Sequence, residues 1–175
     1  MRFQRSREKQ NSFRYPEDQK MIRSLFTLLF LLSSLCATPG AIGEESPDYA
    51  CAPTQEDEMG PLYVEGAPER NQVGSGYLLM GTVKSATDCL PIAGAIIEIW
   101  MVGPQGHYGD DWRATLFSAG NGRYYLRSHS PPNYGTGRPH IHIKVSRDGF
   151  KTLITQHYPA ENAGEGMFNL VLVPN

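Results

Sequence analysis

Short apolar runs separated by turn residues dominate the chain from Gly76 onward. Within several of them apolar and polar positions alternate, which is typical of strands with one face against a core. Asn121-Gly122 lies between two runs and is a strong hairpin signal. No amphipathic helical period and no internal repeat is visible in the sequence. The pattern predicts strands at 77–83, 95–102, 115–118, 123–127, 140–146, 152–157 and 168–173.

Many short strands with regular turns predict an all-β fold, a two-sheet β-sandwich with long functional loops. The run 95–102 is apolar on both faces except at Glu98, so we expect a central strand covered on both sides. Residues 44–73 are rich in Pro, Gly and charge and predict an irregular arm. We therefore divide the chain into an N-terminal extension with a signal peptide (1–43), the arm (44–73) and the sandwich domain that carries function (74–175).

Residues 21–43 have the organisation of a secretory signal peptide. Arg23 supplies a positive start, 24–35 form an apolar run, and Ala41-Ile42-Gly43 is a small-x-small cleavage site. The run is shorter than the roughly 20 residues of a membrane-spanning helix, although an uncleaved anchor is the alternative. The basic stretch before Met21 indicates a long positively charged region or a start at Met21. The sequence thus predicts export to a periplasm or the extracellular space, without stable membrane insertion after cleavage.

The charge balance argues against a nucleic-acid partner. Residues 1–43 hold 7 of the 16 Lys and Arg and 3 of the 18 Asp and Glu, so the remainder carries a net charge of −6. A basic surface that would bind phosphates is therefore absent.

Cys51 and Cys89 are the cysteines that remain after removal of the predicted signal peptide. An even cysteine count in an exported protein predicts a disulfide. Two free buried thiols are the alternative.

A possible metal site begins with the segment Arg138-Pro139-His140-Ile141-His142. In a strand, His140 and His142 share one face at a backbone separation of roughly 6–7 Å, so both rings can converge on one ion. Imidazole suits zinc, copper, iron and nickel. A His-x-His pair alone is weak evidence, because such pairs also occur on solvated strand faces.

Further motifs precede this histidine pair. Glu98-Ile99-Trp100 is followed by a loop that ends in Gly106-His107-Tyr108, and Gly122-Arg123-Tyr124 leads to Pro131-Pro132-Asn133-Tyr134. Together with Arg138-Pro139-His140-Ile141-His142, the order resembles that of the intradiol ring-cleavage dioxygenases. The chain is similar to their compact secreted branch and to the catalytic domain of catechol 1,2- and protocatechuate 3,4-dioxygenases.

The resemblance extends beyond these motifs. Gly60-Pro61-Leu62-Tyr63 looks like the arm that precedes the family's catalytic domain, and Leu153-Ile154-Thr155-Gln156 looks like the strand after its histidines. The resemblance therefore covers about residues 51–173.

The resemblance implies one Fe(III) per chain, held by Tyr108, Tyr134, His140 and His142. Phenolate oxygens are hard, strongly donating ligands that suit a ferric ion, and a free tyrosine has a pKa near 10, so a strongly Lewis-acidic ion is needed to hold them ionised. The implied activity is cleavage of a catechol-type ring between its hydroxyls with O2, giving a cis,cis-muconate-type product in the breakdown of aromatic compounds.

Roles for other residues follow from the same resemblance. Arg138 would stabilise the anionic substrate, Tyr134 would accept a substrate proton, and Gln156 would lie near the bound ring and the ligands. Pocket walls are expected at three further residues: Leu62, Tyr63 and Trp100.

Several features depart from the family or compete with its ligands. Only five residues lie between Tyr134 and His140, and the helical dimerisation segment of larger relatives has no counterpart. Substrate identity and the choice between monomer and homo-oligomer therefore stay open. Tyr124 and Tyr125 fit a strand, as core and sheet surface. The remaining histidines, His107, His129 and His157, are expected at the surface or in support of the site.

Two other functions remain as alternatives. Gly81-Thr82-Val83 followed by Pro91-Ile92-Ala93-Gly94-Ala95 is an opening shared with non-catalytic transthyretin-like and carboxypeptidase-regulatory-like β-sandwich binding modules. A zinc hydrolase built on the histidine pair would need a third ligand, for which Asp148 or His157 would have to serve.

Overall fold

The computed structural model describes residues 48–133, 135 and 137–175. The N-terminal extension and signal peptide predicted at 1–43 lie outside these residues. In the part of the chain that is described, no helix is long and apolar enough to cross a membrane.

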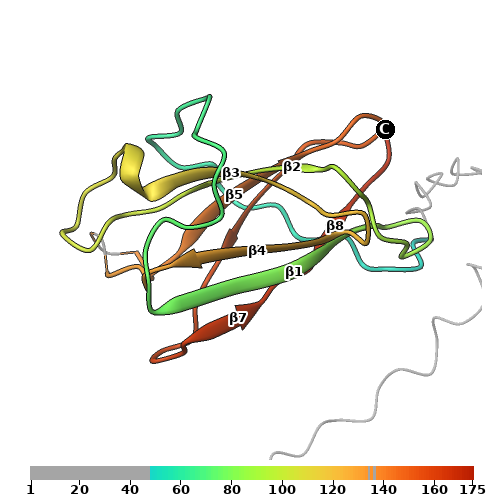
Figure 1. Cartoon of the computed structure of the whole chain (residues 1–175). Coiled ribbons are helices and arrows are strands. Elements are labelled where there is room, and N and C mark those ends of the chain that lie inside the picture. Colours follow the sequence, from blue (N-terminus) through green and yellow to red (C-terminus); the bar gives the residue numbers. More distant parts are fainter. Residues whose placement is uncertain (1–47, 134, 136) are drawn as a thin grey trace, which may run out of the picture. The chain divides into compact units, whose positions relative to one another are not determined.

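Two four-stranded sheets form the described domain (Figure 1). One has the order β4-β1-β7, with β8 also paired to β1, and the other has the order β3-β2-β5-β6. This architecture confirms the predicted two-sheet β-sandwich. The elements are β1 (Tyr77–Ser85), β2 (Ile96–Trp100), the 3-10 helix η1 (Asp110–Trp112), β3 (Arg113–Phe117), β4 (Arg123–Ser128), β5 (Ile141–Ser146), β6 (Leu153–His157), β7 (Glu165–Met167) and β8 (Leu170–Leu172).

The core follows from the alternation of apolar side chains along the strands. Every second residue of β1 and β4 is buried, as the period of two requires. Leu79 and Leu126 meet Ile97, Ile99 and Ile143 of the other sheet in one core cluster, and all five are at most 1% exposed. Burial of each such side chain contributes about 1.5–3 kcal/mol.

The central strand and the last strand differ in detail from the prediction. β2 lies between β3 and β5, as expected, but Ile96 is 39% exposed, so the outer face is covered only toward Trp100. The run 168–173 holds one strand, β8, which is shorter than predicted and begins only at Leu170, and β7 before it was not predicted. Between the two, Asn169 Oδ1 accepts a hydrogen bond from Thr82 N at 3.0 Å, and β7 and β8 pair separately with β1. The helix η1 was not predicted.

The arm between residues 51 and 73 contains isolated bridges but no strand or helix. Single backbone hydrogen bonds hold it against both sheets, from Asp57 N to Ile154 O at 2.9 Å and from Val73 N to Arg127 O at 2.8 Å. Because these contacts fix the arm along its length, it can form a wall of a site on the sandwich.

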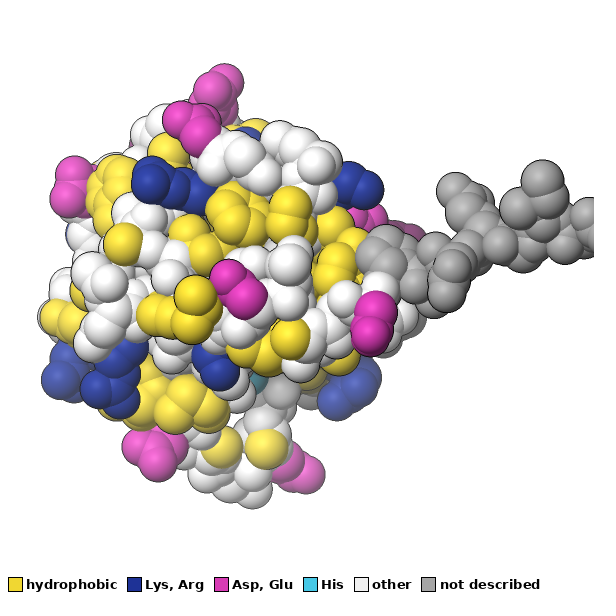
Figure 2. Space-filling view, turned by 90° about the vertical axis from the view of Figure 1, so that its right-hand side faces the viewer, with side chains coloured by type: hydrophobic (Ala, Val, Ile, Leu, Met, Phe, Trp, Pro, Cys, Tyr) yellow, Lys and Arg dark blue, Asp and Glu magenta, His cyan; other side chains and the backbone are white. Residues whose placement is uncertain are grey.

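Figure 2 shows apolar side chains interspersed with polar, basic and acidic ones over one face of the domain. Scattered exposed apolar residues are normal for a folded surface. This face thus carries both signs of charge.

A disulfide joins Cys51 of the arm to Cys89, which follows β1. The two Cα atoms are 5.3 Å apart, within the usual range for a disulfide. The bridge spans a sequence separation of 38 residues and ties the start of the arm to the sandwich.

Loss of this bridge is expected to destabilise the domain. In the chain-entropy model, closing a loop of this length stabilises a fold by about 3–4 kcal/mol. Cys51→Ser with Cys89→Ser should lower the free energy of unfolding in urea by a comparable amount, and dithiothreitol should destabilise the wild type but not the double variant. Detection of two free thiols by mass spectrometry of the non-reduced protein would contradict the assignment.

Candidate active site

Strand pairing gathers the candidate site on the outer face of the sheet β3-β2-β5-β6. His142 of β5 lies opposite Trp100 of β2 and opposite Gln156 of β6. Residues paired across antiparallel strands project to the same face, so these three side chains form a row at one end of the sheet. Glu98 and Lys144 form the adjacent pair on the same face.

Three of the four predicted metal ligands meet at this end of the sheet. The Nε2 atoms of His140 and His142 are 3.0 Å apart, and their rings are nearly perpendicular. The Tyr108 hydroxyl lies 3.3 Å from His142 Nε2. Tyr134 lies outside the described residues. A phenol and two imidazoles from two separate segments therefore converge on one point.

The hydrogen bonding of His140 and the burial of His142 both favour metal binding. His140 Nδ1 donates a hydrogen bond to the carbonyl oxygen of Arg138 at 2.6 Å, so that Nε2, which faces His142, is the ring nitrogen available to a metal. Burial and, to a smaller extent, repulsion from His140 lower the pKa of His142 to about 4, against a smaller opposing effect of Asp57. The His142 ring is therefore neutral near pH 7, as a metal ligand must be.

The arrangement of these atoms fits a single metal ion. Adjacent ligands at a metal–nitrogen distance of about 2.1 Å are about 3 Å apart, close to the observed separation of the two Nε2 atoms. Phenol and imidazole donors together suit a ferric ion.

The zinc-hydrolase alternative lacks its third ligand in the described part of the chain, where no group of three His, Cys, Asp or Glu side chains could hold a metal. His157 Nε2 is instead 2.6 Å from the Tyr77 hydroxyl, and Asp148 lines a separate cavity.

Packing from two sides holds the His142 ring. Trp100 stacks on it with 4.9 Å between ring centroids and 4° between planes. On another side the arm approaches closely at Gly60, where a Cβ would lie 2.8 Å from His142 Cε1. Gly60 also has a φ of 68°, which favours glycine. Sequence motifs alone gave no signal for this contact.

The arm is tied to the sheet beside this ring by three polar side chains. The Tyr63 hydroxyl donates to Glu98 Oε1 at 2.8 Å and accepts from Lys144 Nζ at 2.7 Å. Lys144 also forms an ion pair with Glu98 at 2.8 Å. The Tyr63 ring meets Trp100 edge-on at 5.1 Å, so the network supports the tryptophan that stacks on His142.

The loop that carries Tyr108 is fixed at its start. Gly103 N donates to His107 O at 2.8 Å, closing a tight turn, and Trp112 packs so closely on Gly103 that a Cβ there would overlap it. His129 Nε2 donates to Val102 O at 2.8 Å. His129 is only 9% exposed and its role is to hold the loop, whereas His107 is exposed.

A cavity of about 500 Å³ opens over the converging ligands. Arg138 and Gln156 line it, as expected for residues near a substrate. Gln156 Nε2 donates to the backbone oxygen of Glu58 in the arm at 2.8 Å. Three residues that sequence motifs did not single out also line it: Asp57, Glu58 and Tyr158.

The expected pocket walls Leu62, Tyr63 and Trp100 are not among the residues that line this cavity. Leu62 is 53% exposed, and Trp100 is 4% exposed behind His142. Trp100 instead stacks on the imidazole ring of His142, a candidate metal ligand, and Tyr63 packs against Trp100.

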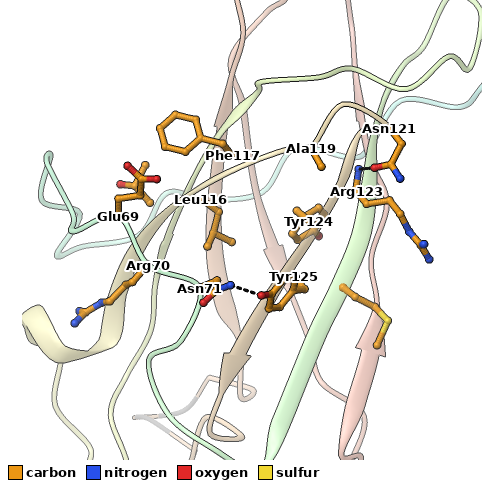
Figure 3. Close-up of a pocket in the computed structure, with 12 residues that line it drawn as sticks. Glu69, Arg70, Asn71, Leu116, Phe117, Ala119, Asn121, Arg123, Tyr124 and Tyr125 are labelled. Atoms are coloured by element: carbon orange, nitrogen blue, oxygen red, sulfur yellow. Dashed lines mark hydrogen bonds between the residues drawn. The ribbon is translucent and has the colours of Figure 1, made fainter.

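A larger cavity of about 680 Å³ lies between the edge strands β3 and β4 (Figure 3). It contains none of the candidate ligands. The Arg70 side chain points away from it and donates to the Arg113 carbonyl oxygen, while Asn71 bonds the Tyr125 hydroxyl. Tyr124 is buried and Tyr125 is 47% exposed, which confirms the core and surface positions predicted for them.

No family model matches the chain, but curated proteins and solved structures do. A chlorocatechol 1,2-dioxygenase of Pseudomonas putida is 33% identical over 134 residues, covering 57% of this chain and 51% of that protein. A 6-chlorohydroxyquinol 1,2-dioxygenase of Cupriavidus pinatubonensis is 28% identical over 167 residues, covering 76% and 59%. The chain thus spans about half the length of the curated relatives it matches.

Solved structures share the fold. The dioxygenase domain of a dioxygenase carbohydrate-binding protein fusion from Streptomyces sp. SirexAA-E matches with a TM-score of 0.64 at 24% identity, covering 71% of this chain and all of that one. An intradiol ring-cleavage dioxygenase from Tetranychus urticae matches with a TM-score of 0.65 at 18% identity, covering 71% and 96%. The chain is thus similar in sequence to curated 1,2-dioxygenases of catechol-type compounds and shares its fold with solved intradiol dioxygenases.

Proposed function

We propose that the chain is a non-haem Fe(III)-dependent intradiol dioxygenase. It uses O2 to cleave a catechol-type aromatic ring between its two hydroxyls and yields a cis,cis-muconate-type product. The observation that carries the proposal is the convergence of the Tyr108 hydroxyl with the Nε2 atoms of His140 and His142. The dioxygenase names of the curated relatives support it.

Tyr108, His140 and His142 would hold the iron, together with Tyr134, which lies outside the described residues. When bound, the ferric ion would supply the Lewis acidity that binds both catechol oxygens and the redox chemistry toward O2. Tyr134 is proposed to accept one catechol proton at its phenolic oxygen.

Arg138 and the arm supply the rest of the site. The Arg138 guanidinium lines the cavity and would stabilise the negative charge of a bound catechol. Gln156 donates to the Glu58 carbonyl and so positions the arm, which walls the cavity with Gly60 and Pro61. A wall of this kind limits the access of water to the reacting ring.

Export of the protein is part of the proposal. The disulfide between Cys51 and Cys89 is typical of oxidising compartments, in agreement with the signal peptide expected at 21–43. The non-catalytic sandwich alternative gives no reason for a phenol and two imidazoles to converge.

Metal analysis and a visible spectrum of the purified protein test the proposal most directly. One iron per chain with a visible absorption band, and O2 uptake with a panel of catechols, are the expected results. A colourless protein that contains zinc, or a ferric protein that takes up no O2 with any catechol, would overturn it.

Removal of one ligand is expected to release the iron. Tyr108→Phe and His140→Ala should each lose iron and colour, because one of the converging donor atoms is gone. Tyr125→Phe, a tyrosine on the exposed surface of β4, is the matched control and should keep both. Full iron occupancy in Tyr108→Phe and His140→Ala, measured by atomic emission, would refute the ligand assignment.

Arg138 is expected to matter for turnover rather than for metal binding. Arg138→Ala should keep iron and colour and lose about 100-fold or more in kcat, the usual effect of removing one electrostatic stabiliser of a reacting group. Arg147→Ala, at the opposite end of β5, serves as the control. An Arg138→Ala variant with wild-type O2 uptake would remove this residue from the mechanism.

Close approach of the arm is expected to control the position of His142. Gly60→Ala and Gly66→Ala both place an alanine at positive φ, which costs about 1–2 kcal/mol, but only the Gly60 Cβ meets His142. Gly60→Ala should therefore lower iron content as well as stability, whereas Gly66→Ala should lower stability alone. Equal iron content in the two variants would show that His142 tolerates the shift.

A further inference from the structure

Two acidic residues stand at the rim of the cavity that the proposed function assigns to the substrate. Asp57 and Glu58 both line it and both are exposed to solvent. Arg138 is the one Lys or Arg among the described residues that line it. The rim therefore carries an excess of negative charge on its arm side.

Hydrogen bonds hold the Asp57 carboxylate in place. Its Oδ1 accepts from Glu58 N at 2.7 Å, and its Oδ2 lies 2.9 Å from the Tyr158 hydroxyl, which is also 3.0 Å from Gln156 Oε1. The Asp57 backbone is anchored on β6 through Ile154 O. This negative charge is thus a fixed feature of the cavity wall.

Arg138 forms no ion pair with Asp57 or Glu58. Its guanidinium carbon lies 4.9 Å from the centre of the Tyr158 ring, on which it stacks as a cation–π pair. Tyr158 thus lies between the arginine and Asp57, with its ring toward one and its hydroxyl toward the other. If Arg138 serves the oxygen-bearing end of the substrate, a ring substituent that points to the arm meets the two carboxylates.

We propose that Asp57 and Glu58 select catechols by the charge of their ring substituent, accepting neutral and cationic substituents and disfavouring carboxylates. This inference rests on the proposed function. Like charges brought together at a binding site give specificity by repulsion, and salt screens the effect where the groups are exposed.

Three catechols with the same ring and side chains of similar length test the inference: 4-ethylcatechol, 4-(2-aminoethyl)catechol and 3,4-dihydroxyphenylacetate. Anaerobic titration of the iron-loaded protein, followed by its visible spectrum, gives a Kd for each without turnover. At low salt the cationic compound should bind roughly fivefold to tenfold more tightly than the anionic one, with the neutral compound between them. The ratio should shrink at about 0.5 M NaCl.

Two variants locate the effect. Asp57→Asn with Glu58→Gln keeps the size of both side chains and should reduce the ratio to less than about twofold. Glu58→Gln alone should reduce it partly and covers the case in which the double variant is unstable, because the Glu58 side chain forms no hydrogen bond with another described residue. Asp148→Asn, in a separate cavity after β5, should leave it unchanged.

The outcomes separate the two proposals. Equal affinity of the wild type for all three compounds would overturn the charge selection and leave the dioxygenase proposal intact. A preference that persists unchanged in both rim variants would also overturn it. Failure of all three catechols to alter the spectrum of the iron-loaded protein would overturn the proposed function and this inference with it.

Discussion

The antiparallel pairing of β5 with β2 is the constraint on which the site depends. This register places His142 beside Trp100, whose indole plane lies almost parallel to the imidazole. Because a shift by one residue would turn every side chain of β5 to the other face, the buried residues Ile141, Ile143 and Val145 fix the register and with it the direction of His142. Core packing on one face of the strand therefore determines the chemistry on the other.

The arm supplies the part of the site that the sheet does not. Its path over the outer face is fixed by the disulfide at Cys51 and by the bonds of Tyr63 to Glu98 and Lys144. Between these anchors Gly60 lies against His142, and Asp57 and Glu58 form the rim of the cavity. An irregular segment thereby acquires a defined position without a helix or strand of its own. The same segment supplies both a wall for the ligand ring and the charges that face a substrate.

Buried and exposed residues have different functions in this site. His142 is 2% exposed and neutral, which suits a ligand, whereas Arg138 and the two acidic residues remain in contact with solvent. Charges at such a rim act on the approach and the choice of a ligand more than on the stability of the fold. A larger cavity lies elsewhere, between β3 and β4, and contains no comparable set of donor atoms. Chemical character, and not volume, identifies the site.

The sequence by itself determined the fold class and most strand positions, because alternating apolar residues define strands locally. Tyr108, His140 and His142 were expected to converge because the order of their motifs resembles that of a known family, and the structure brings these three side chains together. It did not predict β7, or that β8 begins only at Leu170, since the Asn169 side-chain oxygen meets the backbone N–H of Thr82 only in the folded sheet. The placement of Trp100 and Tyr63 behind His142, and of Asp57 and Glu58 at the cavity, was likewise decided by tertiary structure. These contacts join segments from about 40 to 100 residues apart through an arm that has no periodic pattern. The local sequence of the arm therefore does not predict where it lies on the sandwich.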